Sequence, residues 1–311
     1  MAKSPNLDIN LVQEPRVQGG NWEFISQTNH NADCVPLEDR FKYVDDLSIL
    51  EIINLLNIGL TTYNIKYHVP SDIPIHGQYV AQENLLSQQY LNKINEWTAN
   101  QKMQISEKKT KSMIVNFTRN YQFMTRLILN HTNIEVVDKM KILGTIVNNK
   151  LTWDDNCAEL IKKVNKRMAL IRSMKAFGAT TEELVHMWVL MCRSVLEQSC
   201  ILWHTSLTLE NIEDLERTQK TFAKLVLRNN YKTYDEALIK LNLLSLPERR
   251  TRLCKNFAES GVRQSTLSDL FIRNKKKPQI RNPEKFKVDF AYTERFRRSS
   301  IIQMQSMLNE P

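Results

Sequence analysis

Two adjacent aspartates, Asp45 and Asp46, lie between short apolar and β-prone runs in residues 41–50. This pattern predicts a β-hairpin with the carboxylates at its turn. The turn matters because neighbouring residues on a straight strand point to opposite faces, whereas a turn can direct both toward one site. Carboxylates are suitable ligands for Mg²⁺, and paired divalent ions about 3.5–4 Å apart catalyse phosphoryl transfer. The alternative is an acidic turn without metal, because Asp favours turns on conformational grounds.

The segments that follow predict a helix packed on a sheet. Apolar residues recur at helical spacing in residues 82–99, and extended segments are expected at residues 112–117 and 142–147, with a hairpin over residues 127–137. Strands with one substantial helix indicate a helix-backed sheet.

From residue 154 onward the pattern becomes helical. Leu160, Val164, Met168 and Ile171 form an apolar stripe, and Thr180 with Glu183 predicts a capping box at the start of the next helix. Further helices are expected at residues 210–227, 233–241 and 247–259. Residues 154–260 therefore indicate an all-helical unit, which gives the fold class α+β.

The run Tyr43-Val44-Asp45-Asp46 resembles the catalytic hairpin of reverse transcriptases, in which paired aspartates lie between two strands of the palm domain. Further blocks resemble the same family from non-LTR retrotransposons, in the same order along the chain. These blocks are residues 103–111, residues 141–147 with 151–153, and residues 215–220 with 234–238 and 246–250. The resemblance covers residues 41–260.

The resemblance implies roles for individual residues. Asp45 would be the direct metal ligand and Asp46 the supporting one, with Mg²⁺ as cofactor. Lys109, in a block where Ser106 replaces the usual Asn, would donate a proton toward pyrophosphate. A solvated charge run is the alternative for Lys109. Gly144, in the segment similar to the primer grip, would allow close approach of the primer or a tight bend, although a glycine in a strand more often marks a bulge.

The resemblance also implies the domain organisation. Residues 41–153 would form a partial polymerase palm, an antiparallel sheet backed by a helix, and residues 154–260 a thumb-like helical domain. Residues 1–40 are expected to have little structure of their own, and residues 261–311 to form a basic extension that is flexible or partly ordered. RNA template and DNA primer would be the partners.

Family members carry another metal-binding aspartate on an earlier strand, and fingers that hold template and nucleotide. Only forty-four residues precede Asp45, and Asp8 lies just 37 residues upstream of it. We interpret Asp8 as a coincidence. The resemblance therefore indicates an RNA-directed DNA polymerase by ancestry that is truncated and impaired, unless another chain completes the palm.

Charge supports a second, non-catalytic hypothesis. The net charge of +9 favours polyanionic partners such as nucleic acid, and residues 273–298 carry ten basic residues against three acidic ones. Lys162, Lys163, Lys166 and Arg167 lie largely off the apolar stripe of their helix. A nucleic-acid-binding protein would use this basic helix and the tail to neutralise phosphates. A solvated surface is the alternative for both, and an unstable product of an element-derived reading frame is a third possibility.

The remaining features exclude several other classes. The five cysteines are odd in number and form no CxxC pair, so we expect reduced thiols rather than a disulfide framework. Cys192, Cys200 and His204 lack a usual zinc spacing, and core packing is expected for them. No apolar run has the length of a signal peptide or a membrane helix. We expect an intracellular protein, nuclear or cytoplasmic, with no membrane partner.

Overall fold

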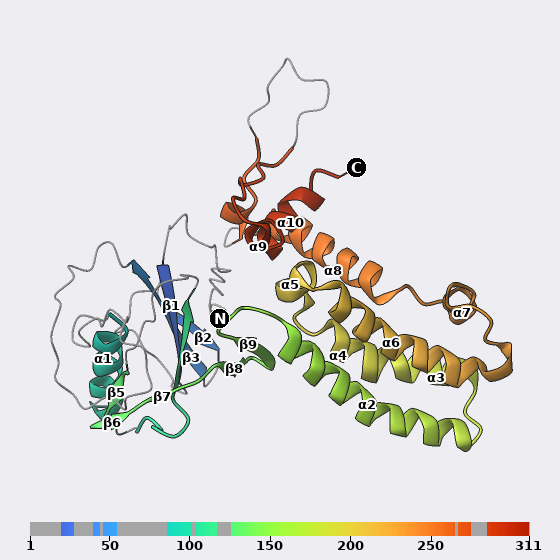
Figure 1. Ribbon diagram of the computed structural model, residues 1–311, viewed down its shortest axis with the longest axis horizontal. Coiled ribbons are helices and arrows are strands. Elements are labelled where there is room, and N and C mark those ends of the chain that lie inside the picture. Colours follow the sequence, from blue (N-terminus) through green and yellow to red (C-terminus); the bar gives the residue numbers. More distant parts are fainter. Residues whose placement is uncertain are drawn as a thin grey trace, which may run out of the picture. The chain divides into compact units, whose positions relative to one another are not determined.

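The computed structural model describes residues 20–27, 40–43, 46–54, 86–100, 102, 104–116, 126–264, 267–274 and 285–310, and the first three of these segments as backbone only. The chain divides into two compact units that meet between Leu151 and Thr152. This boundary lies close to the expected one after residue 153. The first unit contains the strands and one helix, and the second is helical, so the chain mixes α and β structure as expected (Figure 1).

The first unit is built on a five-stranded sheet in the order β2-β3-β1-β4-β7. The strands are β1 (Gly20–Gln27), β2 (Arg40–Tyr43), β3 (Asp46–Asn54), β4 (Lys111–Asn116) and β7 (Glu135–Val136). Since β1 pairs antiparallel with both β3 and β4, the chain passes from β3 through the helix to β4 with β1 between them, a split β-α-β arrangement.

The position of β1 differs from our expectation of little structure before residue 41. Its eight residues carry three large apolar ones, Trp22, Phe24 and Ile25, among polar neighbours, which is a weak local signal. Hydrogen bonding to a strand on each side stabilises β1 where its own sequence does not. The expectation for residues 1–40 was therefore wrong for β1.

Helix α1 (Leu86–Asn100) lies where the apolar spacing predicts a helix, and it contacts β3 and β5 (Ile128–Leu129). The buried Gln88 side chain fixes it to β5 by two hydrogen bonds, donating from Nε2 to the Ile128 carbonyl at 2.9 Å and accepting from the Ile128 amide at 2.8 Å. A hairpin is present, but its second strand is β6 (Thr132–Asn133), joined to β5 by Asn130 and His131. Residues 134–137 were expected as that second strand. Their part Glu135–Val136 instead forms β7 and pairs parallel with β4, so the sheet is not antiparallel throughout as expected.

The second unit contains a succession of helices. They are α2 (Asp154–Ala176), α3 (Thr181–Met187), a π-helical turn (Trp188–Arg193), α4 (Ser194–Glu197), α5 (Cys200–Trp203), α6 (Leu209–Leu227), α7 (Tyr234–Leu241), α8 (Leu246–Gly261), α9 (Glu294–Arg297) and α10 (Ser300–Met307). The capping box of Thr180 and Glu183 is confirmed. Thr208, Thr233, Ser245 and Thr293 likewise accept a backbone hydrogen bond at the start of their helices, so local sequence defines these helix starts.

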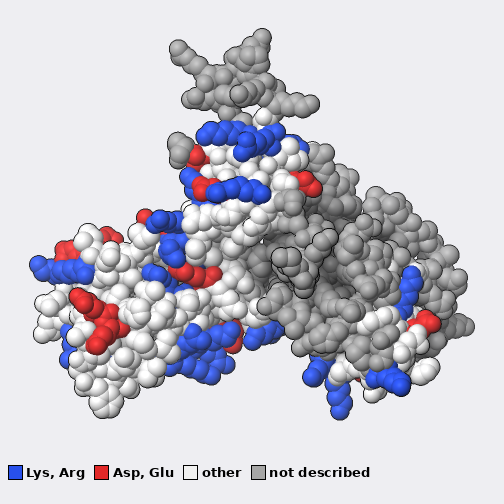
Figure 2. Space-filling view, turned by 180° about the vertical axis from the view of Figure 1, so that it is seen from behind, with Lys and Arg blue, Asp and Glu red and all other residues white. Residues whose placement is uncertain are grey.

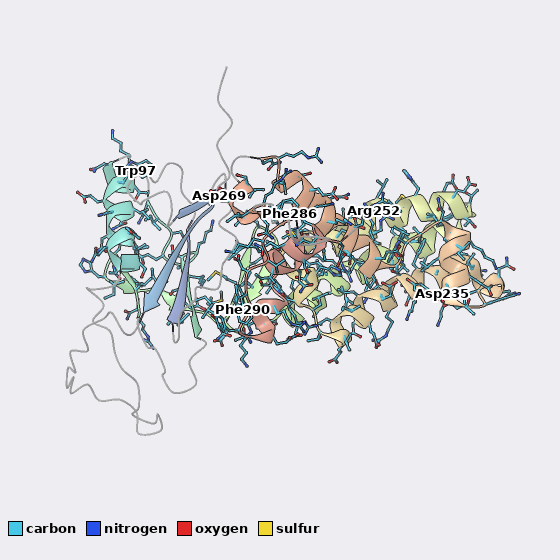
Figure 3. The ribbon with its side chains drawn as sticks, turned by 90° about the horizontal axis from the view of Figure 1, so that it is seen from above. Trp97, Asp235, Arg252, Asp269, Phe286 and Phe290 are labelled. Atoms are coloured by element: carbon cyan, nitrogen blue, oxygen red, sulfur yellow. The ribbon has the colours of Figure 1, made fainter. Side chains whose placement is uncertain are left out.

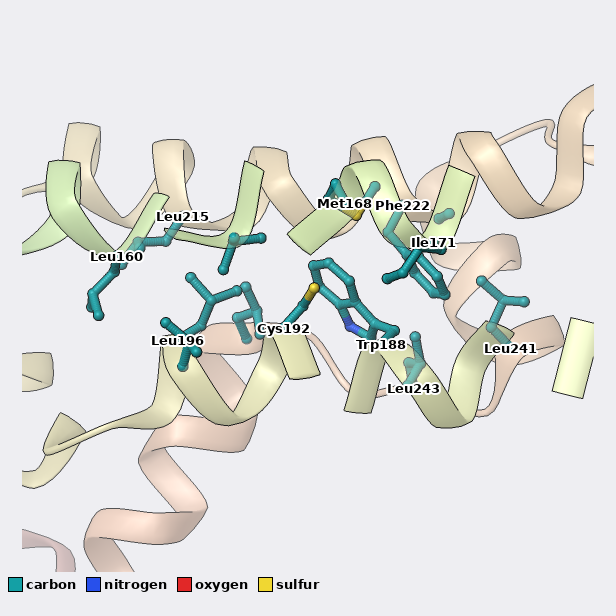
Figure 4. Close-up of a cluster of buried hydrophobic side chains, with 14 of the residues drawn as sticks. Leu160, Met168, Ile171, Trp188, Cys192, Leu196, Leu215, Phe222, Leu241 and Leu243 are labelled. Atoms are coloured by element: carbon teal, nitrogen blue, oxygen red, sulfur yellow. The ribbon is translucent and has the colours of Figure 1, made fainter. Parts of the chain in front are cut away.

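The main core lies between α2, the π-helical turn and α6 (Figure 4). The predicted stripe of α2 is buried, with Met168 and Ile171 beside the stacked rings of Trp188 and Phe222. The centroids of these two rings are 4.6 Å apart and their planes differ by 13°. Aromatic contact and burial of apolar surface together hold α2, α3 and α6 as one layer of packed helices.

A buried polar network joins the three blocks of the helical unit that carry the family resemblance. Gln219 of α6, fully buried, accepts from Trp188 Nε1 at 3.3 Å and donates to Tyr234 Oη at 3.0 Å and to the Leu244 carbonyl at 2.9 Å. Glu216, one turn earlier, accepts from the Tyr234 hydroxyl and from the amide of Leu246. These contacts link α6, α7 and the start of α8.

Arg250 completes this buried region on the α8 side. Its guanidinium lies 5.5 Å from the centre of the Trp203 ring, and its Nε donates to His204 Nδ1 at 3.3 Å. Burial raises the pKa of Glu216, while the hydrogen bonds from Tyr234 and Leu246 and the charge of Arg250 oppose that rise. These partners thus offset part of the cost of burying the carboxyl group.

The segment after residue 261 belongs to the helical unit in its described parts. Phe271, Phe286, Met304 and Met307 form a second core with α8. Gly261 is required for this packing, because a Cβ there would lie 2.8 Å from Phe271 Cε2. Of the two states expected for residues 261–311, flexible or partly ordered, the described residues take the ordered one.

The stability of the helical unit should fall between pH 6.5 and 4 because of His204. Burial and the charge of Arg250 lower the pKa of His204 from 6.5 to about 4. The unfolded chain therefore binds a proton in this window that the folded chain does not, so stability is present above pH 6.5 and is lost as pH falls. The loss is about 3 kcal/mol for this group.

Urea unfolding of the wild type and of His204→Gln as a function of pH measures this loss. The difference in unfolding free energy between the two proteins should shrink as pH falls from 6.5 to 4, while the carboxylates that also titrate in this range affect both alike. Parallel pH profiles would contradict a neutral, buried His204.

Candidate functional site

A hairpin is present in the backbone at the predicted position. Strands β2 and β3 pair antiparallel, and Tyr43 lies opposite Asp46, so the strands are joined by only two residues, Val44 and Asp45. Asp45 itself lies outside the described residues. Asp46 is the first residue of β3, and its side chain is not described. The metal-binding role of both therefore stays a prediction.

Lys109 lies just before β4, at the same edge of the sheet as the hairpin between β2 and β3. Lys111, the first residue of β4, pairs with Ser26 of β1, and Ser26 pairs with Ser48 of β3. Lys109 precedes this row by two residues, and β4 lies two strand spacings from β3, about 10 Å. The register thus brings the Lys109 segment and the hairpin to one edge.

The backbone around Lys109 is held in a tight turn, while its side chain is exposed. The Ser106 carbonyl accepts from the amides of Lys109 and Thr110, at 3.1 and 3.0 Å, and from the Thr110 hydroxyl at 2.9 Å. Thr110 is buried and anchors this turn at the start of β4. The ammonium of Lys109 is available for contact with a phosphate, as its predicted role requires.

Strand β1 occupies the place beside the hairpin where a carboxylate from an earlier strand would be needed. At the hairpin edge β1 ends with Ser26 and Gln27, and Gln27 pairs with Leu47. The only carboxylate of β1 is Glu23, opposite Glu51 and four positions from Gln27, or about 13 Å along the strand. Asp8 lies outside the described residues. By residue type, this end of β1 therefore carries a serine and a glutamine and no carboxylate.

Gly144 lies in a hairpin turn, so the single extended segment expected at residues 142–147 is wrong. Strands β8 (Lys139–Ile142) and β9 (Thr145–Asn148) pair so that Ile142 is opposite Thr145, and both connecting residues have positive φ, 47° at Leu143 and 86° at Gly144. This is the type I′ geometry, for which glycine is favoured. Of the alternatives for Gly144, the structure has the tight bend. Primer contact stays a prediction.

The basic residues of α2 differ in their surroundings. Arg167 donates to the Met191 carbonyl, so part of its hydrogen-bonding capacity holds α2 to the π-helical turn. Lys163 is half-buried. Lys162 and Lys166 line an open groove of about 860 Å³ between α2 and α6, where Asp154, Glu210 and Asp214 also lie. Three carboxylates against two lysines make this groove a poor site for a polyanion.

The C-terminal segment carries an aromatic pair that sequence reasoning missed. Phe290 and Tyr292 are exposed, and their ring centroids are 4.8 Å apart. They lie in residues 285–298, which hold five basic and two acidic residues. The signal was the alternation of aromatic and basic residues, which a charge count alone does not reveal. Figure 2 shows Lys and Arg on one face of the molecule in several groups with acidic residues between them.

Cys192, Cys200 and His204 belong to the core, as expected. Cys192, Cys200 and His204 are all buried. Burial raises the pKa of Cys157 to about 12 and that of Cys192 to about 11, so these thiols are poor nucleophiles near neutral pH. In the part of the chain that the structure describes, no group of three or more His, Cys, Asp and Glu residues could hold a metal ion.

Comparison with known proteins gives no assignment: no family model, curated protein or solved structure matches this chain. Among the described helices, none has the length and apolar character needed to cross a membrane. The site must therefore be judged from its own residues and geometry.

A carboxylate introduced at the end of β1 should strengthen metal binding at the hairpin. Because successive residues of a strand face opposite sides, either Ser26→Asp or Gln27→Asp places a carboxylate on the side of the hairpin aspartates. The added charge should tighten Mn²⁺ binding about tenfold in one of the two variants. Asn21→Asp, at the opposite end of β1, is the matched control.

Mn²⁺ affinity is measured by isothermal titration of the full chain, and the gain should vanish when Asp45→Ala and Asp46→Ala are added. If both variants bind Mn²⁺ no better than the Asn21→Asp control, the proposed place of β1 beside a metal site is wrong.

Proposed function

We propose that this chain contains the palm and thumb parts of a non-LTR retrotransposon reverse transcriptase, an RNA-directed DNA polymerase by descent. The observation that carries the proposal is the pairing of Tyr43 with Asp46, which makes Val44 and Asp45 the whole connection between two antiparallel strands. Asp45 in this connection and Asp46 at the start of β3 are adjacent in the chain, and carboxylates are suited to holding Mg²⁺.

The neighbourhood of the hairpin supports this proposal and limits it. Lys109 leaves the sheet at the hairpin edge, where it suits the role of proton donor to pyrophosphate. The β1 strand at that edge carries Ser26 and Gln27, which are weaker ligands for a second divalent ion than a carboxylate. Among the described strand ends beside the hairpin, that of β1 thus supplies no carboxylate, and we assign no nucleotidyl-transfer step to the chain acting alone.

The helical unit supports the same descent by a separate route. The three blocks that resemble the region after the palm, around Glu216, Tyr234 and Leu246, meet in one buried network. Residues of these blocks have partners that lie far away in sequence, such as Gln219 with Leu244. A shared need for this network is a physical reason for the three blocks to occur together.

A non-catalytic nucleic-acid-binding protein is the second candidate. It is favoured by the net charge of +9 and by the basic residues 285–298. The acidic groove beside Lys162 and Lys166 makes helix α2 the weaker part of that candidate interface. RNA template and DNA primer are the partners that the resemblance implies.

Primer extension on an RNA template tests whether the chain has polymerase activity of its own. We expect the wild type, with Mg²⁺ or Mn²⁺, to extend the primer no more than the Asp45→Ala/Asp46→Ala variant does, because the end of β1 beside the hairpin carries no carboxylate. Both proteins should still bind RNA, with affinity that falls as salt rises.

Primer extension by the wild type that the double variant loses would contradict the incomplete metal site and show a complete catalytic centre. Asp8→Ala then tests whether Asp8 supplies the additional carboxylate. Absence of RNA binding by both folded proteins would contradict the nucleic-acid function altogether.

A further inference from the structure

Phe290 and Tyr292 form an exposed aromatic pair on the C-terminal segment. They are 68% and 76% exposed, and their rings meet edge to face at an interplanar angle of 79°. In such a pair the ring that presents its edge keeps both of its faces open. Phe290 is labelled in Figure 3. Single exposed apolar residues are common, but two aromatic rings in mutual contact at the surface need an explanation.

Two side chains hold the backbone of the segment that carries the rings. They are Gln305 of α10 and Asn309, which follows α10. Asn309 accepts from the Phe286 amide at 2.8 Å and donates to the Phe286 carbonyl at 3.0 Å. The buried Gln305 accepts from the Asp289 amide at 3.1 Å and donates to the Leu270 carbonyl at 2.9 Å.

The buried Phe286 side chain and a backbone hydrogen bond also anchor this segment. The Phe286 ring is buried in the core formed with Phe271 and Met304, and the Lys287 amide donates to the Ile272 carbonyl at 2.8 Å. The chain therefore enters the aromatic pair from an anchored position. Rings presented by an anchored segment lose less conformational freedom when a ligand binds than rings on a loose tail.

The charge around the rings selects the ligand. Residues 285–298 carry an excess of three positive charges, and Figure 2 shows Lys and Arg gathered over this C-terminal region in the upper part of the view. Lys287 pairs with Asp289 at 3.1 Å and Arg297 with Glu294 at 2.7 Å, so acidic residues position two of these cations. Arg298 also donates to the Leu207 carbonyl, at 2.8 Å. The net positive charge of the segment favours an anionic ligand.

We propose that Phe290 and Tyr292 form a stacking site for the bases of single-stranded nucleic acid, with phosphates held by the surrounding Lys and Arg. Every base presents a π-face, and basic grooves with exposed aromatic residues are a general means of binding single strands without sequence preference. A duplex hides its base faces, so the site discriminates against double strands. This inference rests on the nucleic-acid-binding function proposed above.

Fluorescence anisotropy of the full chain tests the site with a labelled 12-nucleotide oligo(U) and a labelled 12-base-pair duplex. Phe290→Ala/Tyr292→Ala should weaken binding of the single strand about tenfold and leave duplex binding within about twofold. Phe177→Ala, which removes a ring that is 91% exposed elsewhere, should change neither affinity. Phe290→Trp/Tyr292→Trp should restore binding of the single strand, because tryptophan also stacks.

Three outcomes would overturn the site while leaving nucleic-acid binding intact: unchanged oligo(U) affinity in the double alanine variant, an equal loss for single strand and duplex, or no recovery with tryptophan. A concentration-dependent dimer of the wild type that the alanine variant loses, seen by sedimentation with oligo(U) binding unchanged, would assign the rings to a contact between copies instead. Failure of the wild type to bind either probe would overturn the nucleic-acid-binding function together with the site.

Discussion

The helical unit depends on a buried side-chain amide that must keep its hydrogen-bond partners. Gln219 has no exposed surface, and an unpaired amide in such a place costs on the order of 1–3 kcal/mol per lost bond. Its three partners, Trp188, Tyr234 and Leu244, come from the π-helical turn, from α7 and from the link to α8. The amide therefore restricts how these elements can be arranged, in a way that apolar packing alone does not. Glu216 extends the same constraint to the first residue of α8.

The sequence predicted those structural features that depend on residues close together in the chain. The stripe of α2, the capping box at Thr180 and the hairpin between Tyr43 and Asp46 all depend on spacing within a few residues, and the structure has each of them. The strand β1 was not predicted, and the C-terminal segment was left open between flexible and partly ordered. Both depend on distant partners: β1 on strands β3 and β4, and Phe286 on Asn309. In the sequence, the Gln219 network corresponded to three blocks that resemble the family, and nothing in them indicated that their residues contact one another.

In the candidate site too, the sequence predicted the residue types but not the neighbours that the fold brings to them. Residue types pointed to Asp45, Asp46 and Lys109, and the strand register places the segments that carry Asp46 and Lys109 at one edge of the sheet. Sequence reasoning could not identify which strand adjoins the hairpin, and that strand carries Ser26 and Gln27 at the critical end. Net charge suggested a nucleic-acid partner but did not separate Lys162, which faces carboxylates, from the basic segment around Phe290.

Hydrogen exchange of the full chain carrying Gln219→Leu, compared with Glu213→Leu on the exposed side of the same helix, tests the central constraint most directly. The buried leucine leaves the Trp188 indole and the Leu244 carbonyl without their partner, so protection should fall together in residues 181–193, 209–227 and 234–261, by about 2–4 kcal/mol. The Glu213→Leu protein should exchange like the wild type. Unchanged protection in Gln219→Leu, or a loss confined to one turn of α6, would contradict the view that this amide holds the helices together.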